Sequence, residues 1–331
     1  MQIDIFKTDP FSLTRITAVI NKLPFYPTRL YRDQLFTEEP ISTTTVEIES
    51  TSEGLVLVPD RPRGAPGQVV NVDRRQLRQF KARHLPQIAT VLADEVQNLR
   101  AFGTESEEET AMGVLMRKMA IARRRIDLTI EWQRVGAIKG IVLDSDGSTP
   151  LTDLYSAFGI SQQVQDMTLD VSGADVLGNL MSAKRKSEDE LGGVSNTGWR
   201  VYSSSTFFDA FVRHDAVKAS FAYFNTSGFS RSDNRGGFVW GTDVEWVEYR
   251  GQVGNIKFIE DDAAYMVPLG VPDLFKTYYA PAPYMETVNT PGLPFYASPE
   301  MMDHGKGVEV ECQSNPLVLN TRPRAIIKLT I

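Results

Sequence analysis

The chain has 331 residues, of which 42% are hydrophobic and 23% charged, so it can hold two folded domains, or one domain with large excursions, and is not disordered as a whole. Its net charge of −7 argues against a dedicated nucleic-acid-binding protein, which needs a surplus of lysine and arginine. Cys312 is the only cysteine, which excludes an intrachain disulfide and a metal site built from several cysteines, and indicates a reducing compartment.

Residues 1–40 are predicted to form an arm that docks on another part of the structure. The segment is rich in apolar residues, but three prolines divide it into pieces too short for a domain. A helix is expected over 12–22, with Ser12 as its cap. The first residues lack an apolar core of signal-peptide length, and no stretch of the chain is apolar enough to span a bilayer, so we expect a soluble intracellular protein.

Residues 43–75 are predicted to form a long β-hairpin. Its apolar and β-branched runs indicate strands over 43–50, 55–58 and 69–72. The loop over 59–67 is rich in proline and glycine, and Arg61 and Arg63 make its tip basic. A ribbon of two or three strands is only marginally stable in water, so it should pack on a neighbour. Solubility is the simpler role for the two arginines, but a stiff projecting ribbon favours salt bridges to another subunit.

Two helices are expected next. The first covers 86–102, because a proline stands at its start. The second covers 107–139, which has 33 residues without a proline and therefore a length of about 50 Å. Its buried stripe is predicted to consist of Met112, Leu115, Met119, Ala122, Ile126, Ile130 and Ala137. The stripe predicted for the first helix consists of Ile88, Val91, Leu92, Val96 and Leu99.

Six cations are expected to make one side of the long helix basic: Arg117, Lys118, Arg123, Arg124, Arg125 and Arg134. A solvated helix face is the simpler interpretation of such a pattern. The functional interpretation is contact with a polyanion or with acidic patches on neighbouring subunits.

Residues 150–275 are predicted to form a mixed α/β unit with its own aromatic core. Helices are expected over 175–190, 204–210 and 215–224. Strands are expected over 199–202, 238–240, 244–249, 257–259 and 264–267, with short extended pieces over 152–158 and 164–169. The chain then returns to extended structure over 276–319, interrupted by a proline-containing loop over 290–304, and closes with a strand over 325–331.

The sequence contains no pattern that predicts catalysis, a cofactor or a metal. The three histidines lack metal-ligand spacing, and the nucleophile elbow, the phosphate-binding loop and the dinucleotide-binding glycines are all missing. Asp144-x-Asp146-Gly147 indicates an ordinary turn rather than a calcium loop, since the later ligands are missing. Cys312 is expected to be a small packed side chain. We therefore predict that the chain is not an enzyme.

An apolar arm, a projecting hairpin and a long helix are unsuited to a lone monomer. A chain that extends several elements beyond its core is usually completed by other copies of itself. The residues alone thus predict a subunit of an assembly.

The segment from Tyr278 to Pro323 resembles that of a known family. Its matching residues are Tyr278-Tyr-Ala-Pro-Ala-x-Tyr-x-Glu-Thr-Val-Asn-Thr290, Gly292-Leu-Pro-x-Tyr-Ala297, His304-Gly-Lys-Gly307, Gln313-Ser-Asn-Pro-Leu317 and Thr321-Arg-Pro323. In these residues, and in the order of its elements, the chain resembles the lambda-type major capsid proteins of tailed phages, the phage capsid E family.

The resemblance implies an α+β chain with the Hong Kong 97-like capsid fold. Residues 1–40 would be the N-arm and 41–80 the extended E-loop. The P domain with its spine helix would comprise 81–149 and 276–320, and the A domain 150–275 and 321–331. The resemblance also implies subunit contacts around three-fold positions through the loop 290–304, so Pro291, Pro294 and Tyr296 join the arginines as candidate interface residues.

The function implied is that of a virion protein that assembles into hexamers and pentamers of an icosahedral shell, which encloses double-stranded DNA and matures from a procapsid. The implied partners are a separate scaffold protein, a portal, a maturation protease, a decoration protein and, by non-specific contact, the packaged DNA. Assembly would take place in the host cytoplasm. Two alternatives stay open: an encapsulin-like compartment of the same fold, and an enzyme with a site near Asp209, His214 and Asp215.

Overall fold

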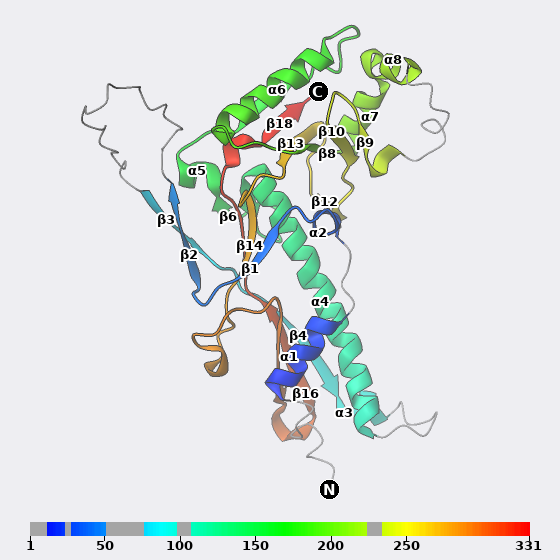
Figure 1. The fold of residues 1–331 in the computed structure, drawn as a ribbon. Helices are drawn as coiled ribbons and strands as arrows, with labels where there is room; N and C mark the ends of the chain where they lie inside the picture. The colour runs from blue at the N-terminus through cyan, green and yellow to red at the C-terminus, as the bar shows by residue number, and fades with distance from the viewer. Residues whose placement is uncertain (1–11, 24–27, 51–75, 98–106, 224–233) are drawn as a thin grey trace, which may run out of the picture. The chain divides into compact units, whose positions relative to one another are not determined.

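The computed structural model describes residues 12–23, 28–50, 76–97, 107–223 and 234–331, and the chain divides into two compact units (Figure 1). Unit 1 comprises residues 1–46, 79–132 and 276–319, and unit 2 comprises 47–78, 133–275 and 320–331. The strands expected over 55–58 and 69–72, and the loop that carries Arg61 and Arg63, lie outside the described residues.

The long helix α4 (Glu107–Lys139) has the predicted bounds. Six of the seven residues predicted for its apolar stripe are buried, and Met112 packs at the edge of the same core. The helix ends where Gly140 adopts a φ of +86°, a left-handed conformation that stops a helix and suits glycine. Uninterrupted helix-forming sequence and a continuous apolar stripe together explain why this element was predictable.

Unit 1 is built from short helices and small sheets around the first part of α4. The three-stranded sheet β15-β16-β4 packs one face on α4 and α1, and a second sheet has the order β1-β14-β17. The N-terminal and central elements are α1 (Leu13–Lys22), α2 (Arg29–Arg32), β1 (Thr37–Pro40), β4 (Leu85–Leu92) and α3 (Ala93–Gln97). The paired strands β2 (Thr45–Ser50) and β3 (Gln76–Lys81) contain residues of both units. The later elements are β14 (Phe275–Tyr279), η5 (Met285–Thr287), β15 (Tyr296–Met301), η6 (Asp303–Gly305), β16 (Gly307–Ser314) and β17 (Pro316–Asn320).

The arm helix α1 occupies the predicted position and buries Ile16 and Ile20 in the core of unit 1. Ser12 is its N-cap residue, but its side chain makes no capping hydrogen bond. The hydroxyl of Thr17 instead joins the helix to β15, because it accepts a hydrogen bond from the amide of Ala297 at 3.1 Å. The amide group of Asn21 adds a hydrogen bond to the carbonyl of Phe295 at 2.9 Å.

The helix predicted over 86–102 is wrong for its first part, which is strand β4. The strand pairs antiparallel with β16 over eight residues, from Leu85 opposite Ser314 to Leu92 opposite Gly307. Burial alternates along it, so that Ala89 and Val91 are buried while Ile88 is 67% exposed. This alternation is that of a β-strand. The backbone hydrogen bonds of β4 go to β16, more than 200 residues later in the chain, and local sequence does not reveal that partner.

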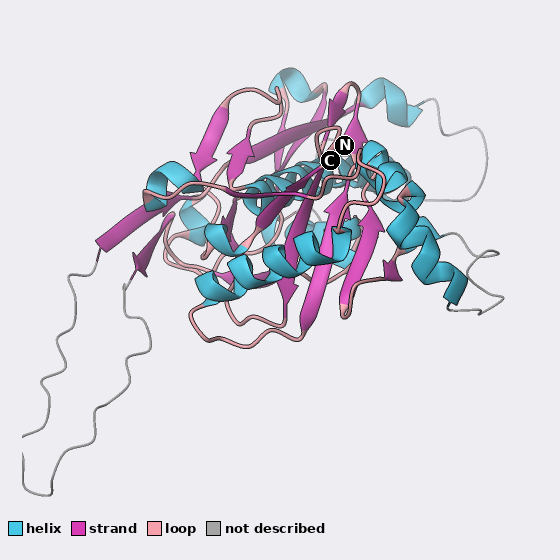
Figure 2. Ribbon diagram, turned by 90° about the horizontal axis from the view of Figure 1, so that it is seen from above, coloured by secondary structure: helices cyan, strands magenta, loops and turns pink. Residues whose placement is uncertain are grey.

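Unit 2 contains a six-stranded sheet in the order β7-β18-β13-β8-β10-β9, with α6 and α7 in contact with it (Figure 2). Its first elements are β5 (Ile141–Leu143), β6 (Pro150–Asp153), α5 (Leu154–Phe158), β7 (Gln163–Asp166), α6 (Val176–Leu191), β8 (Gly198–Ser203), α7 (Ser205–Arg213) and α8 (Asp215–Tyr223). The remaining ones are η4 (Asn234–Gly236), β9 (Phe238–Val239), β10 (Val244–Glu248), β11 (Gln252–Val253), β12 (Ile256–Lys257), β13 (Ala263–Leu269), η7 (Pro323–Ala325) and β18 (Ile327–Thr330).

The core of unit 2 is aromatic, as predicted. Trp246 stacks on Phe211 with ring centroids 3.7 Å apart, and its indole nitrogen donates to the carbonyl of Trp240. The extended piece predicted over 152–158 is wrong in its second half, where Asp153 caps the short helix α5 by accepting from the amide of Ser156. That capping bond gives the segment a local alternative to a strand.

Two glycines of α4 differ in what surrounds them, which predicts opposite effects of alanine. A methyl group at Gly136 would lie 2.8 Å from the Cα of Val142, whereas nothing lies within 4 Å of one at Gly113. We expect Gly136→Ala to lower the free energy of unfolding by about 1–3 kcal/mol, because backbone must move. Gly113→Ala should raise it by about 0.5–1 kcal/mol, because alanine favours helix. Urea unfolding of both variants tests this contrast, and equal effects would contradict it.

Candidate subunit-contact surfaces

The predicted contact residues that the structure describes all lie in unit 1. Arg61 and Arg63 fall outside the described residues. Arg123, Arg124 and Arg125 lie on α4, and the loop between β14 and β15 leads through the two prolines to Tyr296. These residues differ sharply in exposure. Some are buried and link parts of the same chain, and others are exposed at the surface.

Arg123 is a buried tie within the chain. Its guanidinium donates to the carbonyls of Ile20 and Leu23, at the C-terminal end of α1, and lies 4.7 Å from the ring centre of Phe295. The carboxylate of Asp127 lies 3.8 Å from its Nε, and both side chains are buried. Carbonyl groups at the C-terminal end of a helix lack hydrogen-bond donors within that helix. Arg123 supplies donors to two of these carbonyls and so links α1 to α4.

A second buried side chain of α4 ties down the next part of the arm. Glu131 is 2% exposed, and its carboxylate accepts the backbone amide of Leu30 at 2.9 Å. Arg123 and Glu131 thus hold successive arm segments through backbone groups. Charged side chains that sequence patterning assigns to a helix surface are here part of the interior of unit 1.

The side of α4 opposite the core carries an exposed stripe of two arginines and two aliphatic residues. Arg117, Ile121, Arg124 and Leu128 stand at helical spacing; both arginines are exposed, Ile121 is 52% exposed and Leu128 is half-buried. We name these four residues the helix stripe. Lys118 turns away from it, since it donates to the carbonyl of Thr90 and pairs with Glu95. Fewer than the six cations expected from the sequence therefore share one exposed side of α4.

Hydrogen bonds hold the loop after β14, which presents apolar side chains at its surface. The hydroxyl of Tyr296, which is buried, accepts the amide of Leu293 at 2.8 Å. The amide of Gly292 donates to the carbonyl of Ile41 at 2.9 Å, and a methyl group at Gly292 would lie 2.1 Å from the carbonyl oxygen of Tyr279. Pro291 is exposed and Pro294 half-buried. Within this loop the exposed apolar side chains are Met285 (91% exposed), Val288 (59%) and Leu293 (44%).

A carboxylate surface that sequence reasoning missed lies on the sheet β15-β16-β4. Glu300 stands directly opposite Glu309, and Glu311 lies two residues along the same strand, so all three side chains are on one face. Ile88 lies opposite Glu311 on the same face. We name Ile88, Glu300, Glu309 and Glu311 the carboxylate face. The alternation in Gly307-Val-Glu-Val-Glu-Cys was the signal that could have revealed it.

Side chains near Glu311 show how this face meets the loop. The hydroxyl of Tyr284 donates to the Glu311 carboxylate at 3.1 Å. Burial, and then the negative charge of Glu311, raise the pKa of Tyr284 above its ordinary value, so it stays a hydrogen-bond donor. Among the described residues, no lysine, arginine or histidine forms an ion pair with Glu300, Glu309 or Glu311.

The residues first considered for an enzyme site serve structure instead. His214 accepts the amide of Ala216 through Nδ1, and its Nε2 donates to the carbonyl of Val171 at 3.1 Å, so the ring caps α8. Asp209 forms an exposed ion pair with Arg213, and Asp215 accepts from the hydroxyl of Ser172. These three groups have separate partners and do not converge on a common reacting position.

Cys312 and Asp146 are also structural. Cys312 is fully buried, and burial raises its pKa to about 12, which leaves it a poor nucleophile as predicted. Asp146 accepts hydrogen bonds from the hydroxyls and amides of Ser148 and Thr149; the Thr149 hydroxyl chiefly, then these amides, hold its pKa well below the usual range. In the part of the chain that the structure describes, no group of acidic, histidine or cysteine side chains is arranged to hold a metal.

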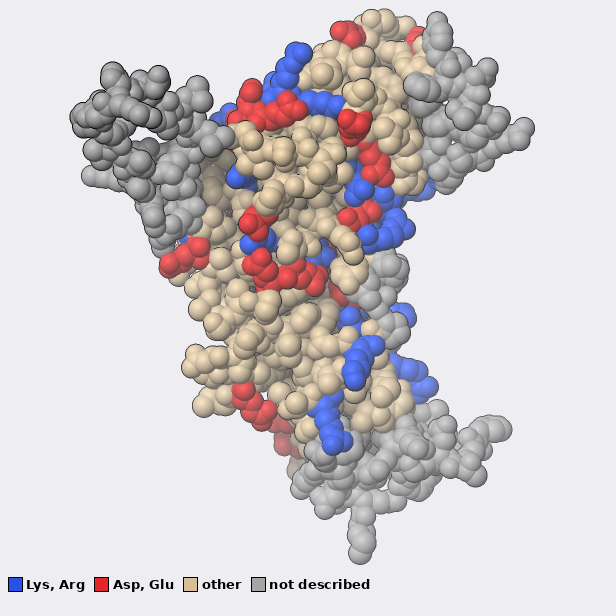
Figure 3. Space-filling model, viewed as in Figure 1, with Lys and Arg blue, Asp and Glu red and all other residues tan. Residues whose placement is uncertain are grey.

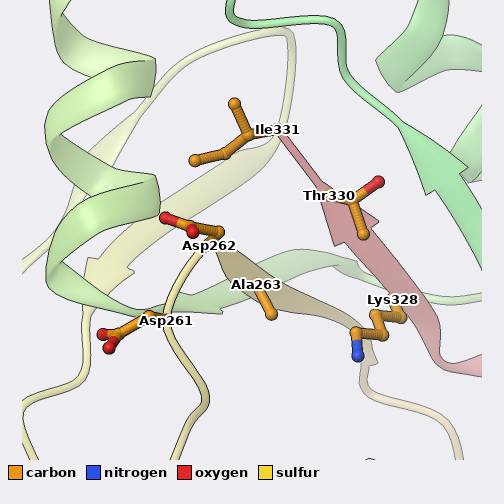
Figure 4. A pocket seen from close by; sticks show the side chains of 6 residues that line it. All are labelled: Asp261, Asp262, Ala263, Lys328, Thr330 and Ile331. Atoms are coloured by element: carbon orange, nitrogen blue, oxygen red, sulfur yellow. The ribbon is translucent and has the colours of Figure 1, made fainter.

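An open hollow of about 600 Å³ in unit 2 lies beside the C-terminal strand. It is lined by Asp261, Asp262, Ala263, Lys328, Thr330 and Ile331. The charged ends point in different directions in Figure 4, and both oxygens of Asp261 already accept from Lys257 at 2.8 Å. The hollow is therefore a surface depression without converging chemistry. Over the described ranges, no helix combines the length and apolarity needed to cross a membrane.

Comparison with known sequences gives full-length matches to capsid proteins. The family described as phage major capsid protein E matches residues 12–331. The major capsid protein of Salmonella phage Felix O1 (isolate Felix O1-VT1) is 25% identical over 354 residues, covering 96% of this chain and 95% of that protein. That of Pseudomonas phage KPP10 is 27% identical over 318 residues and covers 89% of each.

Solved structures share the fold at low identity. The putative capsid protein of a prophage from E. coli CFT073 has a TM-score of 0.62 at 12% identity, covering 97% of this chain and 99% of that one. A phage-related protein from Bordetella bronchiseptica RB50 has a TM-score of 0.55 at 12% identity and covers 95% of each. The cyanophage A-1(L) capsid subunit has a TM-score of 0.51 at 12% identity, covering 93% and 94%.

Proposed function

The chain belongs to the phage major capsid protein E family and has the Hong Kong 97-like fold, so it is a structural protein that forms a capsid shell, and we propose that it does so as hexamers and pentamers. The observation that carries the proposal is the family match over residues 12–331. Oligomers of this kind suit a chain whose helix stripe and carboxylate face carry charged groups that form no ion pair with other described residues.

The proposal extends to the parts of the chain and their roles. Residues 1–40 act as the N-arm and 41–80 as the E-loop. Residues 81–149 and 276–320 act as the P domain, and 150–275 with 321–331 as the A domain. The exposed loop around Pro291 and Pro294 meets neighbouring copies, with Tyr296 as its buried support, and Arg123 acts by holding the arm in place for such contacts.

We propose that assembly starts as a procapsid in the host cytoplasm, with a separate scaffold protein, a portal and a maturation protease. The shell then encloses double-stranded DNA, whose contacts with the wall do not depend on base sequence. A decoration protein stabilises the outside of the mature virion. Assignment to a phage capsid family favours this reading over an encapsulin-like compartment.

Charge reversal at the E-loop tests its proposed role in assembly. Arg61→Glu combined with Arg63→Glu should impair shell formation while the monomer stays folded, because the proline- and glycine-rich sequence of 59–67 predicts a loop tip that contributes little to the core. Electron microscopy scores the particles, and circular dichroism checks the fold. Normal shells from the double variant would remove the role assigned to these arginines.

Imaging of assembled particles tests the function itself. The full chain is produced together with the scaffold protein encoded near its own gene, and lysates are fractionated by sedimentation. Rings and closed shells in the heavy fractions are the expected result in negative stain. Material that stays entirely in the light fractions as folded monomers would contradict the proposal.

A further inference from the structure

The helix α4 carries two stripes of residues with the same spacing. The residues of the first stripe are buried in the core of unit 1 and are separated by four, three and four positions: Leu115, Met119, Ala122 and Ile126. The helix stripe defined above repeats this spacing two positions further along the chain. Two residues turn an α-helix by about 200°, so the helix stripe lies on the side of α4 opposite the core.

The spacing of the helix stripe is that of a coiled-coil seam, in which residues alternately four and three positions apart face a partner helix. Ile121 and Leu128 form one set of seam positions, and Arg117 and Arg124 form the other. The stripe is about 16 Å long, which is about three turns of helix. Ile121 is 52% exposed and both arginines are exposed, so this second seam of α4 is open to a partner.

The side chains of the helix stripe define the chemistry of that partner. Neither Arg117 nor Arg124 forms an ion pair with another described residue, and lysine and arginine side chains gather over the part of unit 1 that holds α1 and the first half of α4 (Figure 3). Nucleic acid would satisfy the arginines but would leave Ile121 and Leu128 in water. A helix with carboxylates opposite the arginines and aliphatic groups opposite the other two residues satisfies all four.

The described part of this chain does not supply such a helix. None of its helices carries two acidic residues seven positions apart, which is the spacing needed to meet both arginines. The carboxylates of unit 1 that form no ion pair lie on a β-sheet, where successive side chains of one face are about 7 Å apart, whereas the two arginines are about 10 Å apart along α4. The occupant should therefore be a different protein.

We propose that the helix stripe binds an amphipathic, acidic helix of the scaffold protein in a coiled-coil-like contact. The proposal rests on the separate scaffold protein set out under Proposed function and names the surface that would bind it. Polar residues at seam positions fix the register of two helices but lower the stability of the pair, so a single contact is weak. Many copies of the stripe in one shell compensate through avidity.

Two variants of the full chain test the contact. The charge variant carries Arg117→Glu and Arg124→Glu, and the aliphatic variant carries Ile121→Gln. The purified, fluorescently labelled scaffold protein encoded near the gene of this chain is titrated with each, at chain concentrations below those that form shells, and anisotropy reports binding. We expect about tenfold or more weaker binding for the charge variant, because like charges meet. The aliphatic variant should bind about threefold to tenfold more weakly, because glutamine loses the apolar contact.

Matched substitutions in unit 2 provide the controls. Leu177→Gln replaces an aliphatic residue that is 48% exposed on α6, and Arg185→Glu with Lys218→Glu reverses two exposed cations. Both control chains should bind the scaffold protein as the wild type does. The two stripe variants should also match the wild type in urea unfolding, because the substituted side chains are exposed.

A short DNA duplex, titrated in the same way, separates a helical partner from a polyanion. The charge variant should lose affinity for the duplex, whereas the aliphatic variant should keep it and lose affinity only for the scaffold protein. Wild-type scaffold binding by the aliphatic variant, with loss of binding by the charge variant, would indicate a surface for any polyanion. That result would overturn the proposed helix contact.

A pair of designed peptides tests the charge chemistry by exchange. Each has about four heptads with leucine at one seam position, and the other position is glutamate in the first peptide and lysine in the second. The wild type should bind the glutamate peptide, and the charge variant should bind the lysine peptide. Failure of this exchange, or scaffold binding that is absent or unaffected by the charge variant, would overturn the contact, while shells formed by the wild type would leave the proposed function standing. Folded wild-type chains that form no shell with their scaffold protein would overturn the proposed function instead.

Discussion

Replacing Arg123 with alanine is expected to lower the free energy of unfolding of unit 1 by about 3–5 kcal/mol. The substitution removes the donors to the carbonyls of Ile20 and Leu23 and the contact with Phe295. It also leaves the buried carboxylate of Asp127 without the guanidinium beside it. Removing one member of a buried charged pair costs far more than removing a surface charge, which is why this effect should be large.

The neighbouring arginine provides a matched control for that variant. Arg124→Ala removes the same side chain one residue later, where it is exposed, and should change stability by less than about 0.5 kcal/mol. Arg123→Lys keeps the charge but loses the planar fork, so its stability should fall between the two. Urea unfolding followed by circular dichroism measures all three. Equal losses for Arg123→Ala and Arg124→Ala would contradict the buried tie.

Replacing Trp246 with alanine is expected to destabilise unit 2 by about 3–5 kcal/mol or more. The side chain is fully buried, stacks on Phe211 at 3.7 Å between ring centroids and is also in contact with Phe207. Its indole N–H donates to the carbonyl of Trp240, which would lose this partner. A cavity of this size in a close-packed aromatic core does not collapse without disturbing several rings.

The control for the aromatic core is Val239→Ala, because Val239 is in the same sheet but 67% exposed. It should leave the urea midpoint nearly unchanged. Near-ultraviolet circular dichroism reports whether the remaining aromatic side chains keep their packing. A Trp246→Ala chain with wild-type stability and spectrum would show that the ring cluster contributes little to unit 2.

Local sequence was sufficient to predict α4 and insufficient to predict β4. Thirty-three residues without proline and with a continuous apolar stripe have one good solution, a helix. The segment from Pro86 to Leu92 fits a helix or a strand equally well by composition. It is a strand because β16, more than 200 residues later, supplies its hydrogen bonds.

The burial of the candidate contact residues was predictable only in part, for a related reason. Three consecutive arginines look alike in sequence, yet Arg123 is buried and Arg124 and Arg125 are exposed. The helix phase that separates them depends on α1 and Phe295 packing on one side of α4. The carboxylate face required the register of β15 and β16, because only pairing brings Glu300 opposite Glu309.

The charged side chains of unit 1 fall into two groups, those buried within the chain and those exposed at its surface. Arg123 and Glu131 hold the arm through its backbone groups, so both charged side chains have their hydrogen-bond partners within one chain. The arginines of the helix stripe and the glutamates of the carboxylate face form no ion pair with any other described residue.

A cryo-electron microscopy reconstruction of the assembled particle tests the central claim most directly. We predict a closed shell built from hexamers and pentamers of this chain, with Arg123 buried against α1 in every copy. A shell built from rings of another size would contradict the proposed hexamers and pentamers. The absence of any closed shell, from chains that fold and are co-produced with their scaffold protein, would contradict the account as a whole.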